Sequence, residues 1–277
     1  MRIYFILGLL CFTLALTAEL PTLAVVICSY NNERWCQLNL ESICQQGYNN
    51  YHIYYCDDCS TDATVQKVKD YIQEHQLEDK ITLITNDVRH YKLYNLYTTI
   101  HNYLKDSDIV VEIDGDDWLL KDDVFDYLAS LYANNDVWMT YGGFVSCPYI
   151  FSFLQSLPIP DNVVATNSFR SFYHKGFIFM ALRTFYAGLF KKIKIKDLYD
   201  ENGRFFTVSS DVATMIPMFE MAGKRFHFIE QECYCYNTDT GHNDYMRDLR
   251  LQNKVYNLIR SKRRYKRIEN YRGDSIK

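Results

Sequence analysis

Acidic side chains crowd one short stretch of this sequence. Glu112, Asp114, Asp116 and Asp117 fall within six residues, separated by Ile113 and a glycine at position 115. Carboxylates this close repel one another unless a cation neutralises them. Oxygen ligands suit Mg²⁺ or Mn²⁺, which commonly share a few carboxylates with substrate phosphates. The stretch therefore predicts a divalent metal site in which a tight turn at the glycine brings Asp114 and Asp116 together. The alternative is a solvated acidic turn that caps the next helix.

Two further polar clusters follow apolar runs earlier in the chain. Ser29-Tyr30-Asn31-Asn32 comes directly after Leu23–Cys28, and Asp57-Asp58-Cys59-Ser60-Thr61-Asp62 comes directly after His52–Cys56. The acidic stretch likewise follows an apolar run, Ile109–Ile113. Short apolar runs of this kind are typical of buried parallel strands. Three polar clusters at three strand ends predict one binding edge, because turn formation alone does not require them to coincide.

The elements that must position these clusters alternate between strand and helix patterns. Helical spacing is predicted over Glu33–Gln46, from Ser60 or Thr61 to about His75, and over Leu93–Leu104, with a further strand at Ile81–Thr85. This order predicts an α/β fold with a mainly parallel sheet flanked by helices on both faces. Ligands of such sheets bind beyond the carboxyl ends of the strands.

The second half of the chain is less regular. Phe144–Lys175 contains three prolines and many aromatic residues and is predicted to be an irregular excursion. Helices are predicted over Phe177–Ile193, Asp211–Ala222 and Tyr245–Lys266. We accordingly divide the chain into a targeting segment, a main domain with a nucleotide-binding half and an acceptor-side extension, and a basic C-terminal helix and tail. These parts span residues 1–18, 19–245 (19–143 and 144–245) and 246–277.

The first eighteen residues have the pattern of a targeting segment. Arg2 precedes the apolar run Ile3–Leu16, which small residues follow. As a helix, the fourteen residues of this run reach only about 21 Å, short of a hydrocarbon core of about 30 Å. We expect a cleaved signal peptide, with an uncleaved anchor as the alternative. The corresponding location is membrane-associated, secretory or periplasmic, or else the cytoplasmic face of a membrane. Nine cysteines leave the redox state of the chain open.

The C-terminal end is basic, although the whole chain carries a net charge of −4. Eleven Lys and Arg oppose three Asp and Glu between Met246 and Lys277, a net charge of 11 − 3 = +8. This asymmetry favours contact with an anionic membrane or a phosphorylated acceptor, and the alternative is a solvated helix without a partner. Nucleic acid is disfavoured, because the chain lacks the pattern of basic residues interleaved with aromatic ones that such binding requires.

The three clusters together resemble the signature blocks of family 2 glycosyltransferases with the GT-A fold, and the resemblance covers about Leu23 to Asn237. It implies that Ser29, Tyr30, Asn31, Asp58 and Asp114 bind a nucleotide-sugar donor. Within that set, Tyr30 would stack on the base and Asp58 would bond the uracil. Asp114 would lie beside the ribose and the metal, and Asp116 would be a metal ligand.

The resemblance also implies a catalytic base at the start of a helix in the second half. The matching residue is Asp211, although Ser210 stands where the family usually has Glu. A base there would take the proton of an acceptor hydroxyl as its oxygen attacks the anomeric carbon. The alternative role for Asp211 is that of a helix cap, and both roles are compatible. His242 is a further candidate, as a loop ligand to the metal or the diphosphate.

The expected activity is metal-dependent, inverting transfer of one sugar from a nucleotide diphosphate donor, with a UDP-sugar as the default. The acceptor would be a hydroxyl of a glycan, lipid or protein, and the cofactor Mn²⁺ or Mg²⁺. The Gln-x-x-Arg-Trp block of processive synthases is absent, since Trp occurs only at positions 35, 118 and 138. A catalytically silent nucleotide-sugar-binding or scaffold protein is the alternative.

Overall fold

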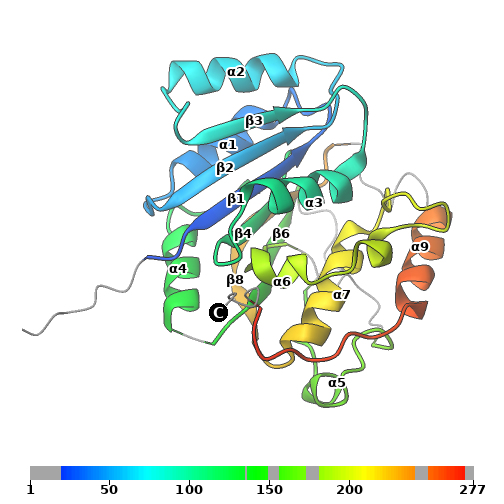
Figure 1. The fold of residues 1–277 in the computed structure, drawn as a ribbon. Coiled ribbons are helices and arrows are strands. Elements are labelled where there is room, and N and C mark those ends of the chain that lie inside the picture. Colours follow the sequence, from blue (N-terminus) through cyan, green and yellow to red (C-terminus); the bar gives the residue numbers. More distant parts are fainter. Residues whose placement is uncertain (1–19, 135, 149–155, 173–180, 241–248, 272–277) are drawn as a thin grey trace, which may run out of the picture.

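The computed structural model describes residues 20–134, 136–148, 156–172, 181–240 and 249–271. They form an eight-stranded sheet with the order β3-β2-β1-β4-β7-β6-β8-β5 (Figure 1). The strands are β1 (Leu23–Ser29), β2 (Tyr51–Asp57), β3 (Ile81–Thr85), β4 (Ile109–Asp114), β5 (Trp118–Leu119), β6 (Met139–Cys147), β7 (Arg183–Tyr186) and β8 (Phe226–Asn237). The sheet runs without a break through both predicted halves of the main domain.

The first four strands to be predicted, β1 to β4, are confirmed and pair in parallel. Their register sets the polar clusters side by side, because Ser29 pairs with Asp57 and Cys28 pairs with Asp114. Asp57 in turn pairs with Thr85 at the end of β3. The carboxyl ends of four strands therefore meet at one edge, as the sequence predicts.

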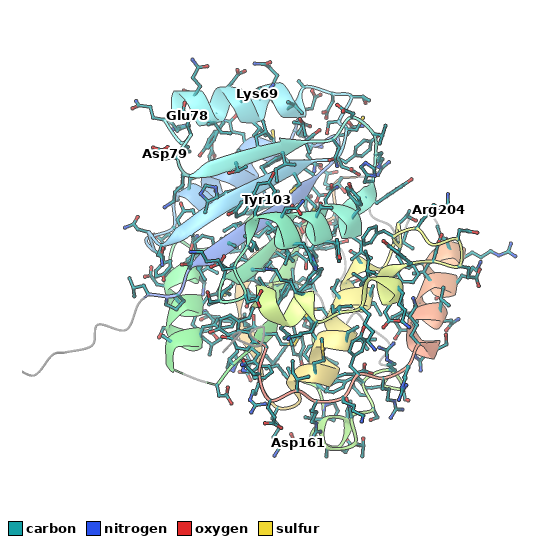
Figure 2. All side chains as sticks on the ribbon, viewed as in Figure 1. Lys69, Glu78, Asp79, Tyr103, Asp161 and Arg204 are labelled. Carbon is teal, nitrogen blue, oxygen red and sulfur yellow. A yellow bond between two sulfur atoms is a disulfide. The ribbon has the colours of Figure 1, made fainter. Side chains whose placement is uncertain are left out.

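Helices cover both faces of the sheet, which confirms the predicted α/β class (Figure 1). One core packs β1 side chains such as Leu23 and Val25 against α1, α2 and α4, and the other packs Ala24 and Val26 against α3, α6, α7 and α9. The longer helices are α1 (Cys36–Cys44), α2 (Thr64–Glu74), α3 (Tyr91–Tyr103), α4 (Val124–Asn134), α7 (Ser210–Ala222) and α9 (Leu249–Ser261). Shorter ones are α5 (Asp161–Thr166), α6 (Ala187–Lys191) and a 3-10 turn, η1 (Ile195–Leu198). On the outer face of α2, exposed polar side chains such as Lys69 point away from the sheet (Figure 2).

The predicted helix over Phe177–Ile193 is wrong in its described part. Residues Arg183–Tyr186 form β7, which pairs antiparallel with both β4 and β6, and only Ala187–Lys191 are helical. The strand is enclosed by neighbours on both sides, so sheet pairing outweighs the helical propensity of the segment. The sheet is consequently mixed rather than mainly parallel across its whole width. Strands β5, β6 and β8 were not predicted either, and β8 pairs parallel with β6 and antiparallel with β5.

The predicted C-terminal helix is also too long. The helix α9 ends at Ser261, and the chain then crosses the body of the protein as an irregular strap, residues 262–271. Lys262 Nζ donates to the carbonyl of Tyr199 at 2.9 Å, and Arg267 donates to the carbonyl of Val164. Several cations of the basic cluster therefore hold the strap to the body, and contact with a membrane stays a prediction.

Some predictions fall on residues outside the description, namely the targeting segment 1–18, His242 and the last residues 272–277. Within the described ranges, no helix combines the length and apolar character needed to cross a membrane.

A disulfide between Cys147 and Cys235 links β6 to β8.

Candidate active site

The loop after β1 and the loop after β4 lie in direct contact. The side chain of Ser29 is 3% exposed and its hydroxyl accepts hydrogen bonds from Tyr55 Oη at 2.9 Å and Asn32 Nδ2 at 3.1 Å. A Cβ on Gly115 would lie 2.6 Å from the Cβ of Ser29. The predicted turn is present, since the N–H of Asp117 donates to the carbonyl of Asp114 at 3.1 Å, and the glycine is needed there for the close approach of Ser29. Ser29, a predicted donor residue, lies buried beneath this contact.

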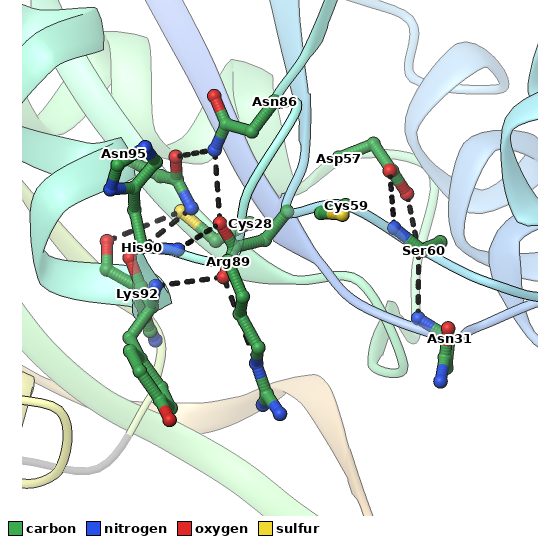
Figure 3. Close-up of polar contacts among 12 residues, drawn as sticks. Cys28, Asn31, Asp57, Cys59, Ser60, Asn86, Arg89, His90, Lys92 and Asn95 are labelled. Atoms are coloured by element: carbon green, nitrogen blue, oxygen red, sulfur yellow. Dashed lines mark hydrogen bonds and ion pairs between the residues drawn. The ribbon is translucent and has the colours of Figure 1, made fainter.

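The loop after β1 is also tied to the loop after β2. The backbone N–H of Asn31 donates to Ser60 Oγ at 2.8 Å, and Asn31 Oδ1 accepts from the N–H of Thr61 at 2.8 Å. The carboxylate of Asp57 in turn accepts hydrogen bonds from the backbone N–H and the hydroxyl of Ser60 (Figure 3). The predicted first and second clusters thus form one rigid platform, in which the side chains of Asn31 and Ser60 are used for internal bonding.

Asp58 stabilises the start of α3. Its carboxylate accepts hydrogen bonds from the N–H groups of His90 at 2.8 Å and Tyr91 at 2.7 Å, and from Asn86 Nδ2 at 2.9 Å. The first N–H groups of a helix lack partners within the helix and favour a negative charge. Asp58 is 3% exposed, and it supplies both the hydrogen-bond acceptor and the negative charge from a distant part of the sequence. Its predicted bond to the donor base stays a prediction.

Tyr30, the predicted stacking partner of the base, carries a cation on its ring. The guanidinium carbon of Arg89 lies 3.7 Å from the ring centroid of Tyr30 and 4.7 Å from that of Tyr91. Guanidinium groups stack on aromatic faces and also bind phosphates in a bidentate manner. Arg89 therefore extends the donor side of the site with a cation that the sequence analysis did not select.

Two cations balance the acidic stretch. Lys92 Nζ lies 2.8 Å from Glu112 Oε1 and also bonds Asp114 Oδ1. Arg183 Nη2 lies 2.9 Å from Glu112 Oε1 and 3.5 Å from Asp114 Oδ2. The sequence analysis expected a metal to relieve the repulsion among these carboxylates. Side chains of the protein itself relieve part of it. The paired guanidinium and ammonium lower the pKa of buried Glu112 to about 2, despite the opposing effect of burial.

The last two carboxylates of the stretch differ in their surroundings. Asp117 is 1% exposed and accepts bonds from Tyr234 Oη at 2.6 Å and from the N–H of Asn237 at 2.8 Å, which fixes the loop to β8. Burial, followed by the charge of Asp116, raises its pKa. Asp116 is partly exposed, and burial together with the charge of Asp114 raises its pKa to about 6.

Asp114 and Asp116 fit a divalent metal by their chemistry. The like charge of Asp114 raises the pKa of Asp116, so a cation between them would relieve a repulsion that is present in the protein alone. Magnesium-like ions commonly take one or two protein carboxylates and complete their shell with water and phosphate oxygens. In the described part of the chain, no group of three or more His, Cys, Asp or Glu side chains could hold a metal by itself.

Asp211 joins the same cluster from the first turn of α7. The predicted helix over Asp211–Ala222 is confirmed, starting one residue earlier. Arg183 interacts electrostatically with Asp211 as well as with Asp114, so residues from β7, β4 and α7 converge. Burial raises the pKa of Asp211, and the positive charge of Arg183 opposes this effect. A carboxylate with a raised pKa is a stronger base when it is ionised.

A cavity of about 650 Å³ adjoins the first turn of α3. Its walls come from α3, from the loop of residues 199–207 and from α9, and include Tyr91, Tyr94 and Phe205. Arg204 projects from the rim of this loop, with 77% of its side chain exposed (Figure 2). The loop ends four residues before Asp211, which is not itself among the residues that line the cavity.

Sequence reasoning missed Arg89, Lys92 and Arg183. Arg89 and Lys92 follow β3, a parallel strand whose carboxyl end meets the same edge as the other clusters, and that position was the available signal. Arg183 had no such signal, because its strand was predicted to be helical.

Comparison with known proteins identifies the family. The model of the family described as "Glycosyl transferase family 2" matches residues 24–197, more than half of the chain. EpsE of Bacillus subtilis (strain 168), itself named as a candidate glycosyltransferase, is 33% identical over 99 residues. That match spans 35% of this chain and 34% of EpsE.

Solved structures show the same fold. TarS (residues 1–349) of S. aureus, in complex with UDP, matches with a TM-score of 0.56 and 14% identity, over 78% of this chain and 60% of that one. The mannosyltransferase PcManGT from Pyrobaculum calidifontis, in complex with GDP-Man and Mn²⁺, matches with a TM-score of 0.53 and 20% identity, over 79% and 57%. This chain thus covers less than two thirds of either neighbour. With the family match across more than half of its length and the GT-A fold, the chain belongs to glycosyltransferase family 2.

Proposed function

We propose that this glycosyltransferase moves one sugar from a nucleotide diphosphate donor to an acceptor hydroxyl, with inversion at the anomeric carbon. The observation that carries this proposal is that Asp114, 3.5 Å from Arg183 at the carboxyl edge of the sheet, and Asp211 both interact electrostatically with that guanidinium. One carboxylate is suited to the donor side of the reaction and the other to the acceptor side. The solved neighbours with bound UDP and GDP-Man support the donor class, and a UDP-sugar is the default.

Asp211 acts as the general base in this proposal. The acceptor oxygen forms a bond to the anomeric carbon while the bond from that carbon to the diphosphate oxygen breaks, and the diphosphate keeps the electron pair. The hydroxyl proton passes to Asp211. Because the attacking and leaving oxygens lie on opposite faces of the carbon, the configuration inverts.

Asp114 and Asp116 would hold Mn²⁺ or Mg²⁺ together with the diphosphate. When bound, the ion supplies positive charge that stabilises the diphosphate as it leaves. Arg89 and Tyr30 would orient the nucleotide's aromatic base, since both present flat faces at the end of the platform formed by the first two loops.

The acceptor class is a hydroxyl of a glycan, lipid or protein. The cavity beside α3 offers aromatic faces in Tyr91, Tyr94 and Phe205, and such faces suit the apolar side of a sugar ring. Contact of the basic C-terminal cluster with an anionic membrane would favour a lipid-linked acceptor.

A panel of nucleotide sugars tests the proposal. Thermal stabilisation and release of nucleoside diphosphate are measured for each sugar with Mn²⁺ present. We expect one donor to stabilise the wild-type protein and to be turned over slowly, with Asp211→Asn retaining the stabilisation only. Stabilisation without turnover by the wild-type protein, across the panel and with a range of acceptors, would favour a silent nucleotide-sugar-binding protein instead.

A further inference from the structure

Lys92 forms an ion pair with Asp114, the first carboxylate of the predicted metal site. Lys92 Nζ bonds Asp114 Oδ1 and lies 2.8 Å from Glu112 Oε1. The side chains of Lys92 and Asp114 are 23% and 25% exposed, whereas that of Glu112 is 1% exposed. The ammonium therefore lies between a buried carboxylate and one that solvent can reach.

The buried carboxylate has a second counter-ion. Arg183 Nε and Nη2 lie 3.1 and 2.9 Å from Glu112 Oε1, and the side chain of Arg183 is 6% exposed. Arg183 also lies 3.5 Å from Asp114 Oδ2, but its shorter contacts are with Glu112, so Glu112 keeps a buried partner even when Lys92 turns away. The charge of Lys92 is then available to Asp114 or to another anion at the same place.

The backbone at the start of α3 offers little to a phosphate, so the cations of Arg89 and Lys92 are what this end of the helix can present. Helix N-termini often bind phosphates through free N–H groups. Here Asp58 accepts the hydrogen bonds of His90 and Tyr91, and its own negative charge lies at the helix start. Lys92 is the next residue along the helix, and it places a positive charge beside Asp114.

We propose that Lys92 is a diphosphate-binding residue that competes with the divalent cation for Asp114. While no donor is bound, its ammonium neutralises Asp114. When the metal–nucleotide complex takes over Asp114, the ammonium pairs with the diphosphate. The inference rests on the proposed function, because it takes a nucleotide diphosphate as the donor.

The contrary role is purely structural. If Lys92 only balances Glu112, its loss should lower stability without changing affinity for a cation or for the diphosphate. If Lys92 also neutralises Asp114, removing the ammonium should strengthen binding of a bare cation and weaken binding of the diphosphate. These opposite signs cannot come from a general loss of structure.

The test compares Lys92→Met with Lys191→Met. Lys191 is a matched control, because its side chain is 22% exposed and its Nζ lies 3.1 Å from Asp106 Oδ1. This ion pair does not involve the acidic stretch. Calorimetry measures Mn²⁺ alone, then UDP, GDP, ADP and uridine with Mn²⁺ present. We expect Lys92→Met to bind Mn²⁺ at least about tenfold tighter and the diphosphate at least about tenfold more weakly, with uridine unchanged. Lys191→Met should match the wild-type protein throughout.

Two further variants keep the test decisive if Lys92→Met folds poorly. Lys92→Arg retains the charge and should keep diphosphate affinity within a few fold of wild type. Lys92→Met with Glu112→Gln restores the buried charge balance, and it should still bind Mn²⁺ more tightly and the diphosphate more weakly.

The outcomes separate the two proposals. Wild-type affinities in the Lys92→Met, Glu112→Gln double variant would show that Lys92 serves only Glu112 and would overturn the inference alone. Failure of the wild-type protein to bind any of the three diphosphates would overturn the inference and the proposed donor class together.

Discussion

Gly115 and Ser29 touch where the loop after β4 crosses the loop after β1, with 2.6 Å between the Cβ of Ser29 and the place of a Cβ on residue 115. We predict that Gly115→Ala destabilises the protein by about 1–3 kcal/mol, the usual cost of overpacking, and weakens nucleotide binding by shifting Asp114 and Asp116. Chemical unfolding and UDP calorimetry measure the two effects.

A compensating change tests the cause. Ser29→Gly in the Gly115→Ala background removes the nearest atoms and should recover part of both losses, although Asn32 Nδ2 remains 2.8 Å from the new methyl group. Equal stability of Gly115→Ala and the wild-type protein would show that the loops can separate at no cost.

Asp211→Asn should keep the affinity for donor but lose about 10²–10⁴ in turnover, the range for removal of a general base. The control is Asp126→Asn, which changes an exposed first-turn carboxylate of α4 and should leave turnover intact. Steady-state rates with saturating donor measure both. Full activity in a folded Asp211→Asn protein would leave this residue as a helix cap only.

Removal of the divalent ion should weaken donor binding. Asp114 and Asp116 repel each other and the diphosphate, so in EDTA the affinity for UDP should fall by at least about tenfold. Restoring Mn²⁺ or Mg²⁺ should recover it, which calorimetry can follow. Equal affinity with and without the ion contradicts the metal assignment.

Asp116 predicts a specific pH dependence of stability in the metal-free protein. Burial and Asp114 raise its pKa to about 6 in the folded state, above its ordinary value of 3.8. Its contribution to stability is therefore present at low pH and is lost as pH rises through about 6. At pH 7.5 in EDTA, Asp116→Asn should be more stable than wild type by on the order of 2 kcal/mol, after allowance for partial exposure. Urea unfolding at pH 4 should show the advantage shrinking.

The C-terminal strap should stabilise the fold. Tyr271 is 8% exposed, and its ring stacks on Tyr186 at 4.1 Å between centroids. Deleting residues 262–277 should cost about 3 kcal/mol or more in unfolding free energy, the scale for losing a buried aromatic side chain. Urea unfolding measures this cost, and an unchanged midpoint would show that the strap is dispensable.

The charge of the strap needs a different variant. Arg263→Gln with Lys266→Gln changes exposed cations and should alter stability by less than about 0.5 kcal/mol. Loss of salt-sensitive binding to anionic liposomes in this variant is the result expected from a membrane contact. Binding equal to that of wild type would argue that these two charges are only solvated.

The sequence predicted the parallel half of the fold well. Leu23–Cys28 is a continuous apolar run on a strand that is buried on both faces. Ile81–Thr85 is a short run of Ile, Leu and Thr on a half-buried edge strand, and the observed bounds of both strands differ from the predicted ones by one residue at most. The edge-proximal strand β8 mixes charged and aromatic residues, because several of its side chains face solvent, and it has no such signature. The strand β7 is only four residues long and depends on its neighbours for its conformation.

The candidate site was predictable in its carboxylates, whereas its cations had at most one signal, the position of Arg89 and Lys92 after β3. Asp114, Asp116 and Asp211 occupy the ends of recognisable elements, so local pattern was sufficient to find them. Lys92 and Arg183 matter because of where the fold brings them, and their partner Glu112 lies 20 and 71 residues away in the sequence. No local pattern reports such a pairing.

The insertion of β7 between β4 and β6 also sets an order of events during synthesis. Glu112 leaves the ribosome 71 residues before Arg183, which becomes its buried partner. Until β7 docks, β4 is an unprotected outer strand of a four-stranded parallel sheet, a species prone to pairing with other chains. Closure of a loop of this length is slow relative to local helix formation. We therefore expect the nascent chain to lose this exposed strand edge in a single late step, when the second half closes over the first.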